Sequence, residues 1–203
     1  MSENGSLRYG PLGRTCIHLC VDMQNIFGPG SRWDTPWLPR VLPTVERLVA
    51  KYPDRTIFTR FIPVQRPGEG HGTWKHYYER YADMTLERLP PEMVDLVPPL
   101  QQFVPPAEVI DKPVYSPWMV PELERSLVRR GADAVIVTGT ETDVCVLAAV
   151  LGAVDRGYRV VVPTDALCSS SDEAHDASLT VYRERYGQQV ETATADEILS
   201  AWT

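Results

Sequence analysis

Residues 137–150 read VTGTETDVCVLAAV, and this stretch joins two elements of different kinds. Its first residues complete the β-branched run at 134–139, AVIVTG, which is typical of a buried strand. A polar turn then leads into an apolar segment at 143–156, which we predict to be a buried helix. A single thiol, Cys145, lies near the first turn of that helix. A strand that passes through a short turn into a helix is half of a crossover connection.

The same alternation of strand and helix runs along the chain. We predict strands at 15–21, 55–61, 108–112, 134–139, 158–163 and 188–193, and helices at 39–52, 72–83, 121–130, 143–156, 173–186 and 195–202. The first strand, TCIHLCV, shows no polar alternation apart from His18, as expected of a strand that is covered on both faces. The pattern predicts an α/β fold, a three-layer α/β/α sandwich around a six-stranded, mainly parallel, Rossmann-like sheet.

Length and charge restrict the class of protein. The 203 residues fit a single domain, 1–203, and the formal net charge of -7 disfavours nucleic acid and anionic membranes as partners. No apolar run is long enough to span a membrane, and the N-terminal residues lack the apolar centre of a signal peptide. The four cysteines, Cys16, Cys20, Cys145 and Cys168, are too scattered for a disulfide framework, so we expect free thiols and a cytoplasmic location.

Three reactive side chains follow three of the predicted strands. Asp22 follows the first strand, Lys112 ends the third, and Cys145 follows the fourth. Each residue alone has a common structural explanation, as a turn former, a solvated charge or a packed thiol. Function in open parallel sheets collects at the carboxyl ends of the strands, where these three residues would meet. Together they predict a catalytic site.

The motifs around these residues resemble those of the isochorismatase-like cysteine hydrolases. This superfamily includes nicotinamidases, N-carbamoylsarcosine amidohydrolases, ureidoacrylate and biuret hydrolases, and true isochorismatases. The resemblance covers nearly the whole chain and rests on VDMQN at 21–25, DKP at 111–113 and TGTETDVCV at 138–146, and it extends through AVDRGYRV at 153–160 to TDA at 164–166. It implies one isochorismatase-like hydrolase domain that cleaves a C–N bond of a small amide, ureide or carbamoyl compound.

The resemblance also implies a role for each of the three residues. Cys145 would attack the carbonyl carbon and form a thioester, and Asp22 would move protons as acid and base. Lys112 would give electrostatic support. Because a free thiol is mostly protonated at neutral pH, we expect Lys112 and the dipole of the following helix to favour the thiolate.

The turn before the helix carries further expectations. Its backbone N–H groups are placed to stabilise an oxyanion, and the predicted donors are those of Glu141, Val144 and Cys145. Members of the superfamily often hold a cis peptide bond just before this turn, which here maps to the bond between Thr140 and Glu141. We expect Thr142 and Asp143 to cap the helix.

The region after the second strand departs from the nicotinamidase pattern. Nicotinamidases carry an Asp-x-His signature there, with a further histidine, to bind a metal. In TRFIPVQRPGEGHGTWKH, residues 59–76, these positions fall on Arg60 and Ile62, which cannot ligate zinc. His71 and His76 have no carboxylate partner in the motif. We therefore expect no metal and no other cofactor, and nicotinamide is disfavoured as the substrate.

Aromatic-rich inserts after the strands are expected to supply the substrate pocket. The predicted contacts with a small-molecule substrate are Gln24, Phe27, Trp33, Arg60, Trp74, Tyr78, Tyr115 and Trp118. For each aromatic residue the alternative is packing in the core or at a subunit interface, and solvation is the alternative for Arg60. Gln24 and Asn25 have a further alternative, which is structural support of Asp22. Relatives of this kind are commonly homodimers or homotetramers, and we expect the same here.

Other functions remain open. True isochorismatases cleave a vinyl ether without a nucleophilic cysteine, so Cys145 favours acyl transfer over ether hydrolysis. A non-catalytic member of the fold would bind a ligand in the same pocket. A redox thiol would use Cys145, with Cys168 as its possible partner. A dinucleotide-binding domain is excluded because DMQN, and not a glycine-rich turn, follows the first strand.

Overall fold

The computed structural model describes residues 7–203 and is built around a parallel sheet of seven strands. The strands are β1 (Cys16–Val21), β2 (Thr56–Phe61), β3 (Glu108–Lys112), β4 (Ala134–Thr140), β5 (Arg159–Pro163), β6 (Leu167–Cys168) and β7 (Val190–Ala193). Their order is β3-β2-β1-β4-β5-β7, and the two residues of β6 pair with the end of β4. The predicted α/β sandwich is confirmed, with the six predicted strands present and β6 in addition.

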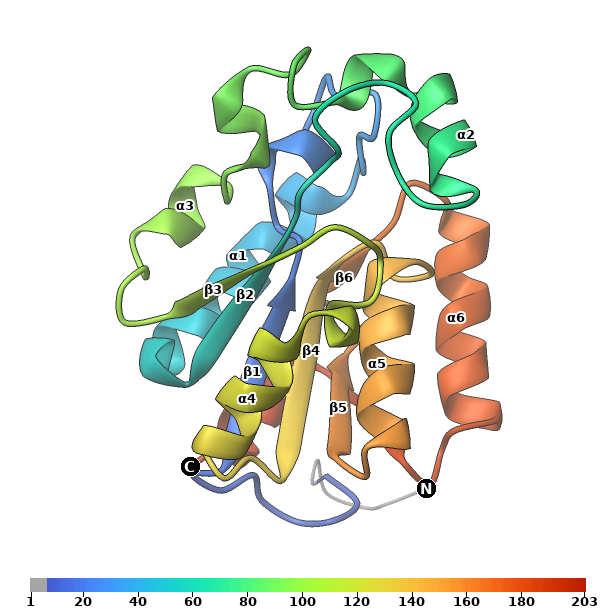
Figure 1. The fold of residues 1–203 in the computed structure, drawn as a ribbon. Coiled ribbons are helices and arrows are strands. Elements are labelled where there is room, and N and C mark those ends of the chain that lie inside the picture. The colour runs from blue at the N-terminus through green and yellow to red at the C-terminus, as the bar shows by residue number, and fades with distance from the viewer. Residues whose placement is uncertain (1–6) are drawn as a thin grey trace.

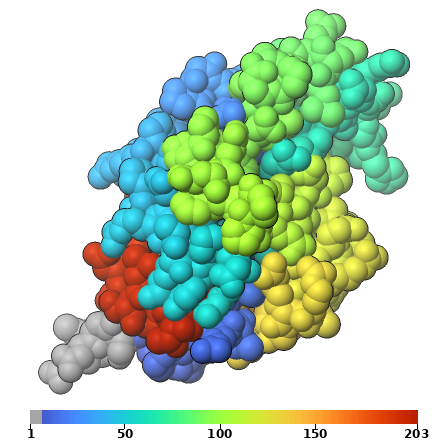
Figure 2. Space-filling view, turned by 90° about the vertical axis from the view of Figure 1, so that its left-hand side faces the viewer, coloured from blue at the N-terminus to red at the C-terminus, as the bar shows by residue number. Residues whose placement is uncertain are grey.

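Helices cover both faces of this sheet (Figure 1). They are α1 (Leu38–Lys51), α2 (Trp74–Arg80), α3 (Pro98–Gln101), α4 (Pro121–Arg129), α5 (Cys145–Asp155), α6 (Asp172–Glu184) and α7 (Ala195–Ala201). One apolar core lies between the sheet and α1 and α7, and a second lies between the sheet and α4, α5 and α6. Figure 2 shows residues near 100, which include α3, on the surface beside α1.

The composition of β1 follows from its place between the two cores. Cys16 and Cys20 point into the core under α1, whereas Ile17 and Leu19 point into the core under α5. Both sides of the strand are buried, which explains why its sequence lacks polar alternation. The one polar residue, His18, has its Nε2 2.7 Å from the Thr138 hydroxyl, whereas its buried Nδ1 has no partner within residues 7–203.

Close approach of β1 and β4 fixes the ends of these strands. Gly139 has φ of +107°, and a Cβ built on it would lie 2.0 Å from the carbonyl oxygen of Val21. Glycine is therefore required where β4 passes the last residue of β1. Asp22 comes next in the chain, so this contact sets its position at the sheet edge. No helix within residues 7–203 is both long and apolar enough to cross a membrane.

Candidate active site

The three predicted reactive residues meet at the carboxyl edge of the sheet, which is the upper edge in Figure 1. Lys112 Nζ lies 2.7 Å from Asp22 Oδ2 and 3.5 Å from Cys145 Sγ. The same ammonium donates to the carbonyl oxygen of Val114 at 3.1 Å. The side chains of Lys112 and Asp22 are completely buried. Lys112 therefore bridges the carboxylate and the thiol, and its position is set by three contacts.

The left-handed backbone conformation of Asp22 directs its side chain toward Lys112. Asp22 has φ of 52°, a conformation that Asp tolerates better than most side chains. Its N–H donates to the carbonyl oxygen of Thr59 at 3.1 Å, and its Oδ1 accepts from the Thr59 hydroxyl at 2.6 Å. Thr59 therefore holds Oδ1 and Lys112 lies beside Oδ2, so both carboxylate oxygens are fixed in place.

The electrostatics of Cys145 differ from the expectation of a resting thiolate. Burial, with the nearby carboxylate of Asp22, raises the pKa of the Cys145 thiol well above its usual value, although Lys112 acts in the opposite direction. Burial alone would lower the pKa of Lys112, but Asp22 and Cys145 raise it overall. Burial therefore favours the protonated thiol of Cys145, and the attraction of Lys112 does not offset it.

The turn from β4 into α5 holds the backbone N–H groups that were predicted to donate to an oxyanion. The peptide bond between Thr140 and Glu141 is cis, as expected. The N–H of Val144 donates to the carbonyl oxygen of Glu141 at 3.0 Å, so the prediction of Val144 as a donor is wrong. Within residues 7–203, the N–H groups of Glu141 and Cys145 donate to no other backbone group outside a helix or strand. The N–H of Asp143 also has no such acceptor in the described residues, so Glu141 and Cys145 are the two predicted donors that remain available for an oxyanion.

Thr142 and Asp143 do not cap α5, contrary to the prediction. The residue before the helix is Val144, which has no side-chain cap. The Thr142 hydroxyl donates to the carbonyl oxygen of Cys168 at 3.1 Å, and the Asp143 carboxylate accepts from the Ser169 hydroxyl. Thr142 thus binds the last residue of β6 and Asp143 the residue after it, because β6 pairs with the end of β4, a contact that the sequence pattern did not show.

A cavity of about 290 Å³ reaches Cys145 from the surface. Six aromatic side chains contribute to its lining: Phe27, Trp33, Phe61, Tyr77, Tyr81 and Tyr115. Its polar lining residues are Arg32, Asp34, Glu141 and Ser170. The volume fits a small molecule, and the rings favour a planar or apolar body with a few oriented polar groups. Phe27, Trp33 and Tyr115 are the predicted substrate contacts that the structure places in this lining.

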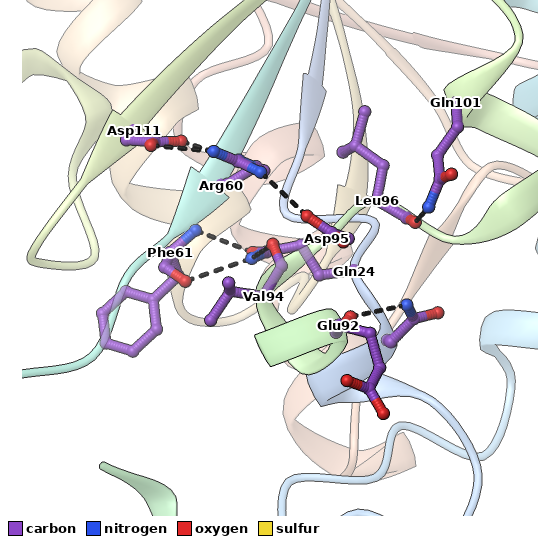
Figure 3. Close-up of polar contacts among 10 residues, drawn as sticks. Gln24, Arg60, Phe61, Glu92, Val94, Asp95, Leu96, Gln101 and Asp111 are labelled. Carbon is purple, nitrogen blue, oxygen red and sulfur yellow. Dashed lines mark hydrogen bonds and ion pairs between the residues drawn. The ribbon is translucent and has the colours of Figure 1, made fainter. Parts of the chain in front are cut away.

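Gln24 and Arg60 are placed elsewhere, as Figure 3 shows. The Gln24 amide donates to the carbonyl oxygens of Phe61 and Val94, at 3.1 and 2.7 Å, and its Oε1 accepts from the Phe61 N–H at 2.7 Å. The Arg60 guanidinium makes two hydrogen bonds to Asp111, at 2.7 and 2.9 Å. It also pairs with Asp95 at 3.2 Å. Gln24 thus joins β2 to the segment at Val94, and Arg60 of β2 pairs with Asp111 of β3 and with Asp95.

The remaining predicted contacts pack behind the lining. Trp118 donates its indole N–H to the carbonyl oxygen of Ala149 at 2.9 Å and covers Gly152, where a Cβ would lie 2.1 Å from its ring. Trp74 packs on Tyr115, with ring centroids 4.7 Å apart, and Tyr78 is buried. These aromatic residues support the cavity wall or α5 and do not line the cavity.

Sequence reasoning missed Arg32, Asp34, Phe61, Tyr77, Tyr81 and Ser170 as lining residues. The spacing of Trp74, Tyr77, Tyr78 and Tyr81 did reveal a helical pattern, but it did not show which ring faces the cavity. No group of three or more His, Cys, Asp or Glu side chains among the described residues is arranged to hold a metal ion.

Comparison with known proteins adds an independent line of argument. Residues 16–194 match the model of the Isochorismatase domain. Nicotinamidase 3 of Arabidopsis thaliana is 28% identical over 171 residues, which cover 83% of this chain and 81% of that protein. A cysteine hydrolase from Pseudomonas syringae pv. phaseolicola 1448A superposes with a TM-score of 0.78 at 22% identity, covering 99% of this chain and 98% of that one. N-carbamoylsarcosine amidase from Thermoplasma acidophilum superposes with a TM-score of 0.71 at 18% identity, covering 89% and 96%.

Proposed function

The chain belongs to the isochorismatase family of hydrolases, and we propose that it is a cysteine-dependent amidohydrolase that cleaves a C–N bond of a small amide, ureide or carbamoyl compound. The observation that carries this proposal is the contact of Lys112 with both Asp22 and Cys145 below an aromatic cavity. A thiol, a carboxylate and an ammonium in contact supply a nucleophile, a proton acceptor and a fixed positive charge.

The first half of the proposed reaction forms a thioester. The sulfur of Cys145 attacks the carbonyl carbon while the thiol proton passes to Asp22. This transfer leaves the net charge of the three residues unchanged, so burial opposes it less than loss of the proton to water. The N–H groups of Glu141 and Cys145 donate to the oxyanion. The C–N bond then breaks, Asp22 returns the proton to the nitrogen, and the amine leaves.

The second half releases the acid. Water attacks the thioester carbonyl and gives its proton to Asp22, and the C–S bond breaks with return of that proton to sulfur. The product is a carboxylic or carbamic acid, and the thiol of Cys145 is restored. Lys112 keeps its proton throughout and stabilises whichever neighbour, Asp22 or Cys145, carries negative charge.

The alternatives receive less support from the geometry. A redox pair of Cys145 and Cys168 would have to join the core under α5 to the core under α1, on opposite faces of the sheet. Ether hydrolysis needs no nucleophilic cysteine, so it would not account for the contact between Lys112 and Cys145. A purely binding role would not require a buried ion pair beside a thiol, which is costly to maintain.

Ammonia release from a panel of small amides, ureides and carbamates tests the proposal. Wild-type protein is expected to hydrolyse at least one compound, Cys145→Ala none, and Cys168→Ala the same compound at the wild-type rate. Intact-mass measurement during turnover is expected to show the acyl group on the wild-type and Cys168→Ala chains and not on Cys145→Ala. Full activity of Cys145→Ala would rule out covalent catalysis by this residue.

A further inference from the structure

Two polar atoms in the cavity lining have no hydrogen-bond partner. Trp33 Nε1 and Asp34 Oδ1 are both buried, and neither has a partner within residues 7–203. Both residues line the cavity above Cys145. They are neighbours in the segment between β1 and α1, so one loop presents both atoms.

These two atoms differ in what they can bind. An indole N–H only donates a hydrogen bond, and a carboxylate oxygen only accepts one. Leaving such an atom buried without a partner costs about 1–3 kcal/mol, and buried polar atoms are paired in the great majority of cases. Two unpaired atoms beside one cavity therefore indicate a ligand that supplies an acceptor to Trp33 and a donor to Asp34.

The charge of the lining indicates what kind of donor is required. Arg32 is paired with Asp83, and its guanidinium carbon lies 4.7 Å from the centre of the Tyr81 ring. Glu141 accepts hydrogen bonds from the N–H and the hydroxyl of Ser170.

Glu141 and Asp34 both lack an ion pair within the described chain, but only the Asp34 carboxylate lacks hydrogen bonds as well. The ion pair of Asp22 and Lys112 adds no net charge at the base of the cavity. The lining as a whole is therefore short of positive charge, and Asp34 is where that charge is missing. A bound cation with N–H donors would supply it.

The aromatic residues around Trp33 are suited to the same kind of ligand. Trp33 lies 5.8 Å from Phe61 and Tyr81, 5.9 Å from Tyr77 and 6.3 Å from Phe27, measured between ring centroids. The faces of such rings attract cations, by roughly 0.5–2 kcal/mol depending on desolvation. Burial raises the pKa of Tyr77, so its phenol stays neutral at physiological pH.

We propose that Asp34 and Trp33 recognise a small amide whose other end carries an ammonium or guanidinium group. The carboxylate of Asp34 accepts from the cation, the indole N–H of Trp33 donates to an oxygen of the same molecule, and the aromatic rings enclose its body. This inference deepens the proposed amidohydrolase function and rests on it, because the ligand is a substrate only if the chain hydrolyses it. Binding of the ligand can be measured without turnover.

Binding to the Cys145→Ala chain is the direct test, because that variant cannot turn the ligand over. The probes are three benzamides that differ only in the para group: 4-(aminomethyl)benzamide, 4-ethylbenzamide and 4-carbamoylbenzoate. Calorimetry is expected to show that the ammonium compound binds roughly 10- to 100-fold more tightly than the neutral one, as for a hydrogen bond to a charged group. The anionic compound is expected to bind most weakly.

Asp34→Asn in the same background is expected to remove that preference and leave the affinity for 4-ethylbenzamide within about twofold. Asp133→Asn is the matched control, since Asp133 is exposed and precedes β4 at the opposite end of the sheet. It makes the same change in charge and is expected to keep the preference. The melting temperature of Asp34→Asn is expected to stay at or above that of the parent, because no partner of the carboxylate is lost.

Several results would overturn the proposal. Tightest binding of the anionic probe would identify Arg32 as the determinant. Equal weakening of all three probes by Asp34→Asn, with a lower melting temperature, would show a structural role, and binding of none of them would remove the recognition pair. Failure of the proposed function is a separate result: selective binding that depends on Asp34, without ammonia release from the wild-type chain on any amide, would refute hydrolysis and leave the recognition intact.

Discussion

The base of the cavity and its wall differ in whether their buried polar groups have partners in the chain. At the base, Asp22 and Lys112 come from the ends of β1 and β3 and are bonded to each other, to Thr59 and to Val114. In the wall, the loop residues Trp33 and Asp34 hold buried polar atoms that have no partner in residues 7–203.

This difference separates two tasks. Groups that stabilise a transition state act best when the protein has already oriented them, and the ion pair with Lys112 and the hydrogen bond from Thr59 orient Asp22 before the substrate arrives. Groups that select a ligand must keep a bonding site open for it. We therefore expect substitutions at the base to change the rate and the stability of the chain, and substitutions in the wall to change affinity.

The largest effect is expected from the carboxylate at the base. Asp22→Asn keeps an oxygen that can accept from Thr59 but cannot take up a proton from Cys145. We expect kcat on the best amide found to fall by about 10²–10⁴-fold, as for loss of a general base. The Asp133→Asn chain serves as the control. An Asp22→Asn chain with wild-type kcat would assign the proton transfer to another residue.

The next effect concerns stability at the base. Lys112→Met leaves Asp22 buried without its counter-charge, which is expected to lower the free energy of unfolding by about 3–5 kcal/mol. Urea denaturation measures this change. Adding Asp22→Asn to Lys112→Met is expected to restore part of the loss, since the second substitution removes the unpaired charge. If the two losses simply add, the two side chains are not energetically coupled.

A third test uses His18, on the same strand as Asp22 but in its middle. Burial lowers the pKa of His18 from 6.5 to about 3. The unfolded chain binds a proton at His18 below pH 6.5, whereas the folded chain does not. The neutral, buried His18 therefore costs no stability above pH 6.5, and the free energy of unfolding decreases as pH falls towards 3.

The expected slope for this single group is about 1.4 kcal/mol per pH unit. Urea denaturation of the wild type and of His18→Gln at several pH values in that window measures the difference. If both chains lose stability equally with falling pH, His18 is protonated in the folded state.

The smallest effect is expected in the wall. Trp33→Phe keeps an aromatic ring but removes the indole N–H, so one hydrogen bond to the ligand is lost. We expect KM to rise by about 2- to 10-fold, equivalent to about 0.5–1.5 kcal/mol, with kcat within about twofold of the wild type. Steady-state kinetics on the amide used for Asp22→Asn make the comparison. A fall in kcat with unchanged KM would place Trp33 with the base and not with the wall.

The base was predictable from the sequence, whereas the wall was predictable only in part, through Phe27, Trp33 and Tyr115. Asp22, Lys112 and Cys145 each follow or end a strand, and parallel strands bring their carboxyl ends to one edge whatever the details of packing. Residues in long loops have no such rule. Arg60 and Trp118 looked like pocket residues, yet Arg60 is held by Asp111 and Trp118 by the carbonyl of Ala149.

Local errors near Cys145 have the same origin. Thr142 and Asp143 have the right residue types for a helix cap, but their side chains bind Cys168 of β6 and the following Ser169 instead. Val144 was expected to offer its N–H to an oxyanion, but the turn itself uses that N–H. Each of these outcomes depends on a neighbouring segment whose position is set by the sheet.

By itself the sequence determined the α/β sandwich, the order of its strands and helices along the chain, and the three residues that converge at the sheet edge. Hydrophobic periodicity and strand ends are local properties of the sequence, so they can be recognised without a structure. Only the tertiary structure decided which loop side chains line the cavity, and that the Cys145 thiol is buried enough to keep its proton. Burial and partner choice depend on segments far apart in the chain, as with Asp34, whose missing partner shows only once every neighbour is in place.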